Sequence, residues 1–244
     1  MARYQVILAY DGTLFKGFQR QGNKRTVQAE VEAALSRLGW QGDRILAAGR
    51  TDSGVHASGQ VIAFDLEWVH GREALLRALN SNLPLDISAW KVVEVTVDFH
   101  PRYHARQRSY QYSIYCQEER NPLLERYAWR VWPPVERDLL EKAAQLLCGT
   151  HDFSAFGAPV RPKGTTNRTI YRAVWDEHAQ GLRFEVAANA FLYHMVRRMV
   201  FLQALVGQRR LNLDEFEMGV VKAQPQPPGL APAHGLVLSE VLYG

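Results

Sequence analysis

The order of strand-like and helix-like segments constrains the fold of this 244-residue chain more than any other feature. The first half reads strand, helix, strand, strand, helix, strand, with Asp11-Gly12 ending the first strand and Thr26 capping the first helix. These elements are expected over residues 3–10, 27–38, 45–48, 61–64, 72–79 and 87–95. Such an order is that of a split βαβ, or ferredoxin-like, unit.

The same order appears again in the second half of the chain. Its strand, helix, hairpin, helix and strand are expected over residues 108–116, 135–147, 170–188, 191–206 and 236–243. The sequence therefore predicts an α+β protein with two βαββαβ halves, residues 1–103 and residues 104–244. We expect the two sheets to join edge to edge into one antiparallel sheet, with a central cleft lined by the irregular segments 49–59 and 149–169.

A polar loop between two apolar runs is the first candidate site. The runs 45–48 and 61–64 are short and bounded by glycine, so they are expected to be buried strands that hold the loop at both ends. Within the loop, Arg50 and Asp52 bracket Thr51, and an extended backbone places their side chains on the same side. The composition also fits an ordinary solvated turn.

Composition is that of a soluble globular protein that binds polyanions. Apolar residues make up 47% and charged residues 22%, and no apolar run approaches the roughly 20 residues of a membrane span. The first residues do not form a secretory signal, so we expect a cytoplasmic protein without membrane contact. The net charge is +4 and the basic residues are clustered, which favours nucleic acid as a partner.

The cysteines and histidines do not predict a metal site. Only Cys116 and Cys148 occur, without a Cys-x-x-Cys pair, so a disulfide framework is not indicated either. His100 and His104 are four residues apart, but Pro101 between them argues against a shared helical face. We therefore expect no metal.

Residues 49–57 read Gly-Arg-Thr-Asp-Ser-Gly-Val-His-Ala, which closely resembles the signature of the tRNA pseudouridine synthase A family. Further matches cover almost the whole chain, at Tyr10-Asp11-Gly12, Gly17-Phe18-Gln19, residues 149–153 and Gly235-Leu236. One departure is Phe201, where a glycine often stands. The resemblance implies the pseudouridine synthase fold and an isomerase that moves the glycosidic bond of a uridine from N1 to C5 of the base.

The resemblance also implies the roles of three residues. Asp52 corresponds to the catalytic aspartate, Tyr110 to the active-site tyrosine and Arg197 to the arginine that pairs with the aspartate. From the residues alone, Tyr110 is more typical of a core aromatic residue. Arg197 lies in an apolar helix, where its head either finds a partner or extends to water.

The substrate implied by the resemblance is the anticodon stem-loop of tRNA, held by a homodimer. Arg50 is expected against a phosphate or in the gap left by the flipped base, and His56 either contacts RNA or supports the loop. Other expected RNA contacts are the basic residues Arg161, Lys163 and Arg168. The reaction is redox-neutral and loses no group, so no cofactor is expected. Asp52 either attacks C1′ or removes the C2′ proton.

Two other classes of protein remain as alternatives. Asp52-Ser53-Gly54 spells the triplet of an aspartic hydrolase, but it occurs once and polar residues precede it. A non-catalytic RNA-binding module would also suit a ferredoxin-like sheet. The chain lacks the basic-Gly-aromatic run that such modules use for base stacking.

Overall fold

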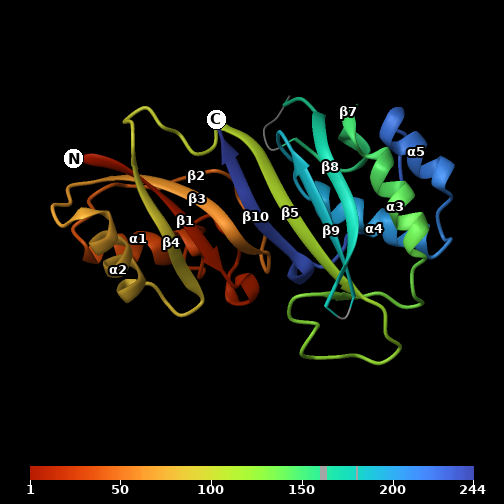
Figure 1. Ribbon diagram of the computed structural model, residues 1–244, viewed down its shortest axis with the longest axis horizontal. Coiled ribbons are helices and arrows are strands. Elements are labelled where there is room, and N and C mark those ends of the chain that lie inside the picture. The colour runs from red at the N-terminus through yellow and green to blue at the C-terminus, as the bar shows by residue number, and fades with distance from the viewer. Residues whose placement is uncertain (160–163, 180) are drawn as a thin grey trace. The chain divides into compact units, whose positions relative to one another are not determined.

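The computed structural model describes residues 1–159, 164–179 and 181–244, which form two compact units (Figure 1). Unit 1 comprises residues 1–106 and 237–244, and unit 2 comprises residues 107–236. Each unit combines helices with strands, so the predicted α+β class is confirmed. The division differs from the expected halves, 1–103 and 104–244, because the last strand of the chain groups with unit 1.

Unit 1 has the predicted order of elements. They are β1 (Ala2–Tyr10), the short 3₁₀ helix η1 (Gly12–Leu14), α1 (Val27–Arg37), β2 (Leu46–Ala47), β3 (His56–Leu66), α2 (Gly71–Asn82) and β4 (Ile87–Val95). Strand β1 lies between β3 and β4 and is antiparallel to both, and β2 pairs with β3. The strand order β4-β1-β3-β2 is that of a split βαβ unit.

The last strand, β10 (Leu236–Tyr243), changes the expected character of the sheet. It pairs in parallel with the beginning of β3, through Val237 opposite His56 and Leu238 opposite Ala57. The sheet is therefore mixed, where one antiparallel sheet was expected. Strand β2 pairs with only two residues of β3, Ile62 and Ala63. The beginning of the same edge of β3 is therefore available to β10. A Cβ atom at Gly59 would lie 2.2 Å from the Ser239 oxygen, so glycine permits this approach.

Helix α1 forms as its sequence predicts. The Thr26 side chain accepts a hydrogen bond from the Ala29 N–H, and Gly39, with φ +90°, follows the last turn. Val31 and Leu35 are buried on its inner face. The helix also meets the loop before it, because the Gln28 N–H donates to the Phe18 carbonyl at 2.9 Å. The start of α1 is thereby joined to residues that contact the candidate loop.

Unit 2 contains the remaining elements. They are β5 (Ala105–Tyr115, in unit 2 from Gln107), β6 (Trp129–Arg130), α3 (Arg137–Leu146), β7 (Gly149–Asp152), η2 (Phe153–Ala155), β8 (Asn167–His178), β9 (Gly181–Ala188), α4 (Met195–Gly207), α5 (Leu213–Val221) and η3 (Ala233–Gly235). The strands β5, β9, β8 and β7 are successive antiparallel neighbours, and β6 pairs in parallel with β5. Helices α3, α4 and α5 pack together beside β8 and β7 (Figure 1).

Two expected boundaries are corrected. Helix α4 begins at Met195 and not at Phe191, because His194 has a left-handed backbone with φ +65° that cannot continue a helix. The expected irregular segments 49–59 and 149–169 are shorter than predicted, since β3 already begins at His56 and β7 occupies residues 149–152. In both segments the strand pairing reaches residues whose composition is typical of a loop.

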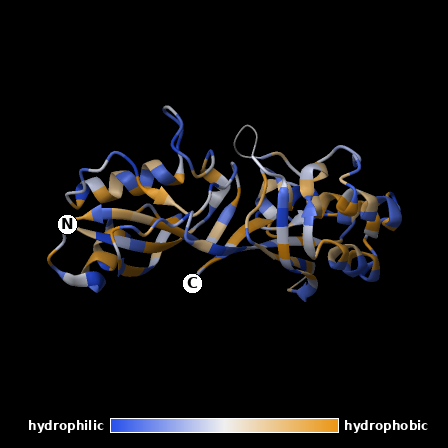
Figure 2. Cartoon of the chain, turned by 90° about the horizontal axis from the view of Figure 1, so that it is seen from above, coloured by the Kyte–Doolittle hydropathy of each residue, from blue (hydrophilic) through white to orange (hydrophobic). Residues whose placement is uncertain are grey.

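The cores follow the hydropathy of the strands, which carry alternating apolar and polar residues (Figure 2). In unit 2 the largest fully buried side chains include Trp175, Tyr112 and Phe184. The indole N–H of Trp175 donates to Gln203 Oε1 at 2.8 Å, so this buried polar pair is satisfied. No helix within the described residues is long and apolar enough to cross a bilayer.

Candidate active site

Asp52 lies between β2 and β3, half-buried, on a backbone that is held on both sides. The Phe18 N–H donates to the Thr51 carbonyl at 3.0 Å, and the Gly54 N–H donates to the Phe15 carbonyl at 3.4 Å. A turn within the loop adds a bond from the Val55 N–H to the Asp52 carbonyl at 3.2 Å. The carboxylate therefore projects from a loop whose position residues 15–18 determine.

Two glycines allow residues 12–18 to approach the loop so closely. A Cβ atom at Gly12 would lie 2.0 Å from the Val55 carbonyl oxygen. Gly17 has φ +86°, and its Cβ would lie 3.0 Å from the Thr51 oxygen. These glycines belong to the two short motifs near the N-terminus, so the motifs and the Asp52 loop are parts of one structure.

The buried hydroxyl group of Tyr10 helps to hold the Asp52 loop in place. The hydroxyl oxygen of Tyr10 lies 2.8 Å from Thr51 Oγ1 and also hydrogen-bonds with the Gln60 side chain. Gln60 in turn donates from Nε2 to the Gly49 carbonyl at 3.0 Å. Burial raises the pKa of Tyr10 to about 12. No local sequence pattern indicates a role for Tyr10 or Gln60, because only the folded chain brings them to the loop.

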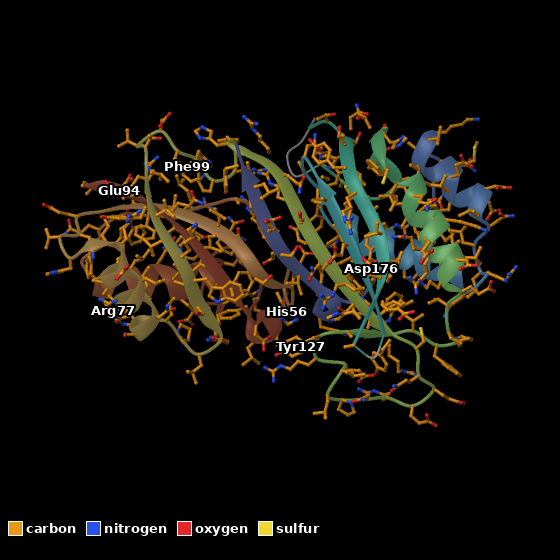
Figure 3. All side chains as sticks on the ribbon, viewed as in Figure 1. His56, Arg77, Glu94, Phe99, Tyr127 and Asp176 are labelled. Carbon is orange, nitrogen blue, oxygen red and sulfur yellow. The ribbon has the colours of Figure 1, made fainter. Side chains whose placement is uncertain are left out.

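His56 is the first residue of β3 and is only 4% exposed (Figure 3). Its Nδ1 accepts a hydrogen bond from the Gly12 N–H at 3.0 Å, while an oxygen of Asp11 lies 3.1 Å from the same nitrogen. Only one of these contacts can be a bond, since the first needs Nδ1 without a proton and the second needs it with one. The bond from Gly12 is favoured because the Asp11 oxygen already accepts from the Thr13 N–H and hydroxyl. His56 is thus buried against residues 11 and 12 of the same unit.

Tyr110 lies on β5, opposite Val186 of β9, and is half-buried. Its ring meets Phe191 edge to face, with centroids 5.1 Å apart and planes at 88°. This contact fixes the plane of the phenol ring. Tyr112, two residues on, is fully buried and donates its hydroxyl to the Pro232 carbonyl at 2.7 Å.

Arg197 lies in the first turn of α4 and is half-buried. Its Nε donates to the Ala231 carbonyl at 2.8 Å, and its own carbonyl accepts from the Ala231 N–H at 3.3 Å. Burial raises the pKa of Tyr112, and the positive charge of Arg197 acts in the opposite direction. The proline-rich segment 225–232, called the strap below, therefore anchors the side chain of Arg197.

The strap also contacts the ring of Phe201. Gly229 has φ +142°, and a Cβ there would lie 2.1 Å from the Phe201 ring. This ring is also stacked with the ring of Trp129, at 6.4 Å between centroids and 19° between planes. The Phe201 ring thus lies between the strap and β6.

The expected RNA contacts are distributed as follows. Arg50 is exposed in the Asp52 loop. Arg168 is half-buried on β8 and donates from Nη1 to the carbonyls of Thr165 and Asn167, and burial lowers its pKa. Arg168 thus supports the backbone of its own segment. Arg161 and Lys163 lie outside the described residues.

Metal ligands do not gather in the part of the chain that the structure describes, where no three His, Cys, Asp or Glu side chains lie together. Cys116 and Cys148 are free thiols. Burial raises the pKa of Cys116, which keeps that thiol protonated near neutral pH.

Comparison with known proteins identifies the family. The model of a family described as tRNA pseudouridine synthase matches residues 6–104 and 143–244, which is most of the chain. The chain belongs to this family. Its members are isomerases, and the matched ranges contain Asp52 and Arg197 but not Tyr110.

Full-length relatives support this assignment. The chain is 40% identical over 247 residues to a tRNA pseudouridine synthase A of Streptococcus equi subsp. equi, covering 100% of this chain and 99% of that protein. It is 39% identical over 244 residues to the Bacillus pumilus protein of the same name, covering 99% of both. A chain in the crystal structure of a Cbf5-Nop10-Gar1 complex aligns with 82% of this chain and 45% of its own, at a TM-score of 0.38 and 12% identity, which is too distant for inference.

Proposed function

We propose that this protein is a tRNA pseudouridine synthase that isomerises uridine to pseudouridine in the anticodon stem-loop. The observation that carries the proposal is the Asp52 carboxylate, half-buried on a loop that β1 and residues 12–18 hold in place. Family membership supplies the reaction class. A carboxylate held in this way suits covalent or general-base chemistry.

The reaction needs one carboxylate and no external reagent. The bond between C1′ and N1 breaks, a bond between C1′ and C5 forms, C5 loses a proton and N1 gains one. In one route Asp52 attacks C1′ and is released when C5 attacks in turn. In the other route Asp52 removes the C2′ proton to give a glycal, to which the base adds again through C5. Both routes conserve atoms and electrons, so neither requires a cofactor.

Two further residues have proposed roles in the reaction. Arg197 pairs with Asp52 and favours its ionised form, because a nearby positive charge lowers the pKa of a carboxyl group. The anchoring of Arg197 Nε by the Ala231 carbonyl supports this role, since a fixed guanidinium orients its partner. Tyr110 stacks on the uracil ring after the nucleotide has left the helix, and Phe191 holds the ring for that contact.

The remaining features of the proposal concern the substrate and the assembly. Arg50 lies against a phosphate or enters the gap left by the flipped base, and Arg161, Lys163 and Arg168 contribute positive charge toward the RNA. The enzyme acts in the cytoplasm as a homodimer that holds one tRNA. Sedimentation of the protein with and without tRNA measures the assembly directly.

Substitution of Asp52 tests the function. We expect Asp52→Asn to keep its affinity for tRNA, because only the charge of one carboxyl group is removed. Its isomerisation rate should fall by at least about 100-fold, because the reacting carboxylate is lost. Release of tritium from tRNA labelled at C5 of uridine measures the reaction, and mapping of pseudouridine gives the positions. Asp43→Asn, an exposed acid of the same unit, is the matched control.

The same assay separates the alternatives. A non-catalytic RNA-binding module would bind tRNA but release no tritium even as the wild-type protein. Undiminished turnover by Asp52→Asn would show that another group performs the chemistry.

A further inference from the structure

The chain segment between β5 and α3 lines a cavity, called the hollow below, that has no role in the proposed reaction. The cavity has a volume of about 580 Å³, and its charged and aromatic lining residues are Arg120, Glu125, Arg126, Trp129, Arg130 and His234. All but His234 belong to residues 116–136, the segment that contains Tyr127 (Figure 3). This segment lies outside the ranges that the family model matches.

The lining of the hollow is positively charged. Three guanidinium groups face one carboxylate, which leaves a net charge of +2 when His234 is neutral. Arg120 binds Glu125 through Nε at 3.0 Å and Nη2 at 2.5 Å to Oε2. Arg130 donates from Nη1 to the carbonyls of Gln117 and Glu118. Two of the three cations are therefore fixed by the protein, so an anion entering the hollow meets a preorganised field.

Trp129 supplies an aromatic surface beside these charges. It is half-buried, lines the hollow, and is stacked with Phe201 of α4. An indole supported by a second ring is a rigid platform on which a nucleobase stacks irrespective of its identity. Guanidinium groups next to such a platform suit the phosphate of the same nucleotide.

The hollow lies close to a residue of the proposed catalytic set. His234 lines it, and the pKa of His234 is lowered chiefly by burial and further by the charge of Arg197. The strap carbonyl that binds Arg197 Nε belongs to Ala231, three residues before His234. A ligand in the hollow is thus near the chain segment that anchors Arg197.

We propose that this hollow is a nucleotide subsite that binds one residue of the RNA substrate, with the base on Trp129 and the phosphate between Arg120 and Arg126. The inference rests on the proposed function, because the RNA is the substrate of that function. The volume suits one nucleotide, since pockets for small organic ligands measure roughly 300–1,000 Å³. The occupant is a nucleotide next to the one that reacts, or another that the folded RNA brings to the same place.

Binding measurements with charge-neutral variants test the subsite. We expect Arg126→Gln and Arg120→Gln each to weaken tRNA binding several-fold. Each should also reduce the slope of log K against log salt concentration by about 0.7–0.9, since one phosphate contact is lost. Trp129→Leu should weaken binding by roughly 5- to 100-fold, while Trp129→Phe keeps a ring and most of the affinity. Arg137→Gln is the control, because Arg137 is an exposed arginine of unit 2 that also pairs with a glutamate.

Unchanged affinity and salt slope in Arg126→Gln and Arg120→Gln would overturn the proposal. Uridine monophosphate distinguishes the source of the ligand. If it binds the wild type but not Arg126→Gln while tRNA binds both equally, the hollow takes a free nucleotide and the RNA assignment is wrong. Crosslinking from a photoreactive amino acid at position 126 to one tRNA position would support the subsite.

These experiments distinguish failure of the subsite proposal from failure of the proposed function. If the wild type isomerises uridine and the arginine variants bind tRNA as tightly as the wild type, the subsite proposal is wrong and the proposed function stands. If the wild type does not isomerise uridine but those variants bind tRNA more weakly than it does, the proposed function is wrong and the hollow still binds RNA. Because Arg126 is exposed, its substitution should leave the melting temperature unchanged.

Discussion

The hydroxyl oxygen of Tyr10 lies 2.8 Å from Thr51 Oγ1, so the end of β1 is bonded to the residue that precedes Asp52. Both side chains are buried, and Gln60 joins the same hydroxyl to the Gly49 carbonyl. The loop that carries the proposed catalytic acid is therefore positioned by the core of unit 1. This arrangement leads to the first prediction.

Tyr10→Phe should reduce kcat with little change in KM for tRNA. Loss of the hydroxyl removes the bond to Thr51 and should lower the free energy of unfolding by about 1 kcal/mol. A small displacement of a catalytic group lowers the catalytic rate by up to roughly 100-fold. Tyr4→Phe, on the same strand, is the control for loss of a tyrosine hydroxyl. A KM effect with unchanged kcat would contradict a positioning role.

Tyr10 should also make the protein less stable at alkaline pH. Burial raises its pKa to about 12, whereas the unfolded chain loses this proton near pH 10. Between these values the folded state binds more protons than the unfolded state, so the free energy of unfolding falls as pH rises. The loss attributable to Tyr10 is roughly 2.3 kcal/mol at pH 12 and approaches roughly 2.7 kcal/mol above that pH. Urea titrations from pH 9 to 12 should show a smaller loss in Tyr10→Phe.

Gly17→Ala should destabilise the protein and impair the reaction. Its φ of +86° is unfavourable for alanine, and the new Cβ would lie 3.0 Å from the Thr51 oxygen. We expect a loss of about 1–3 kcal/mol in the free energy of unfolding, together with reduced kcat. Gly22→Ala is the matched control, because Gly22 also has a positive φ, +47°, but no atom within 4 Å of the added Cβ. Equal effects of both substitutions would assign the loss to backbone strain alone.

Gly229 and Phe201 should be energetically coupled. Gly229→Ala places a Cβ 2.1 Å from the Phe201 ring and should cost about 1–3 kcal/mol. In a Phe201→Ala background the clash disappears, so the double variant should be more stable than the sum of the single effects predicts, by roughly 0.5–3 kcal/mol. Urea denaturation of the four proteins gives the coupling. Additive effects would mean that the strap moves away from α4 at little cost.

Local pattern was sufficient for most elements of the fold. Thr26 and Gly39 mark the ends of α1, and the apolar run of β4 was predicted at residues 87–95, where the strand lies. Caps, turns and side-chain periodicity depend on neighbours in the chain, which the sequence displays directly. The start of α4 was missed because a left-handed residue, His194, interrupts an apolar run that is otherwise helical.

The sequence by itself determined the α+β class, the order of elements and the candidate loop around Asp52, because each depends on residues close together in the chain. Only the tertiary structure decided that β10 pairs with the start of β3, that His56 is buried beneath Gly12, and that Tyr10 holds Thr51. These contacts join residues far apart in sequence, and their partners are selected by packing and strand pairing. No local pattern of polar and apolar residues specifies such a choice.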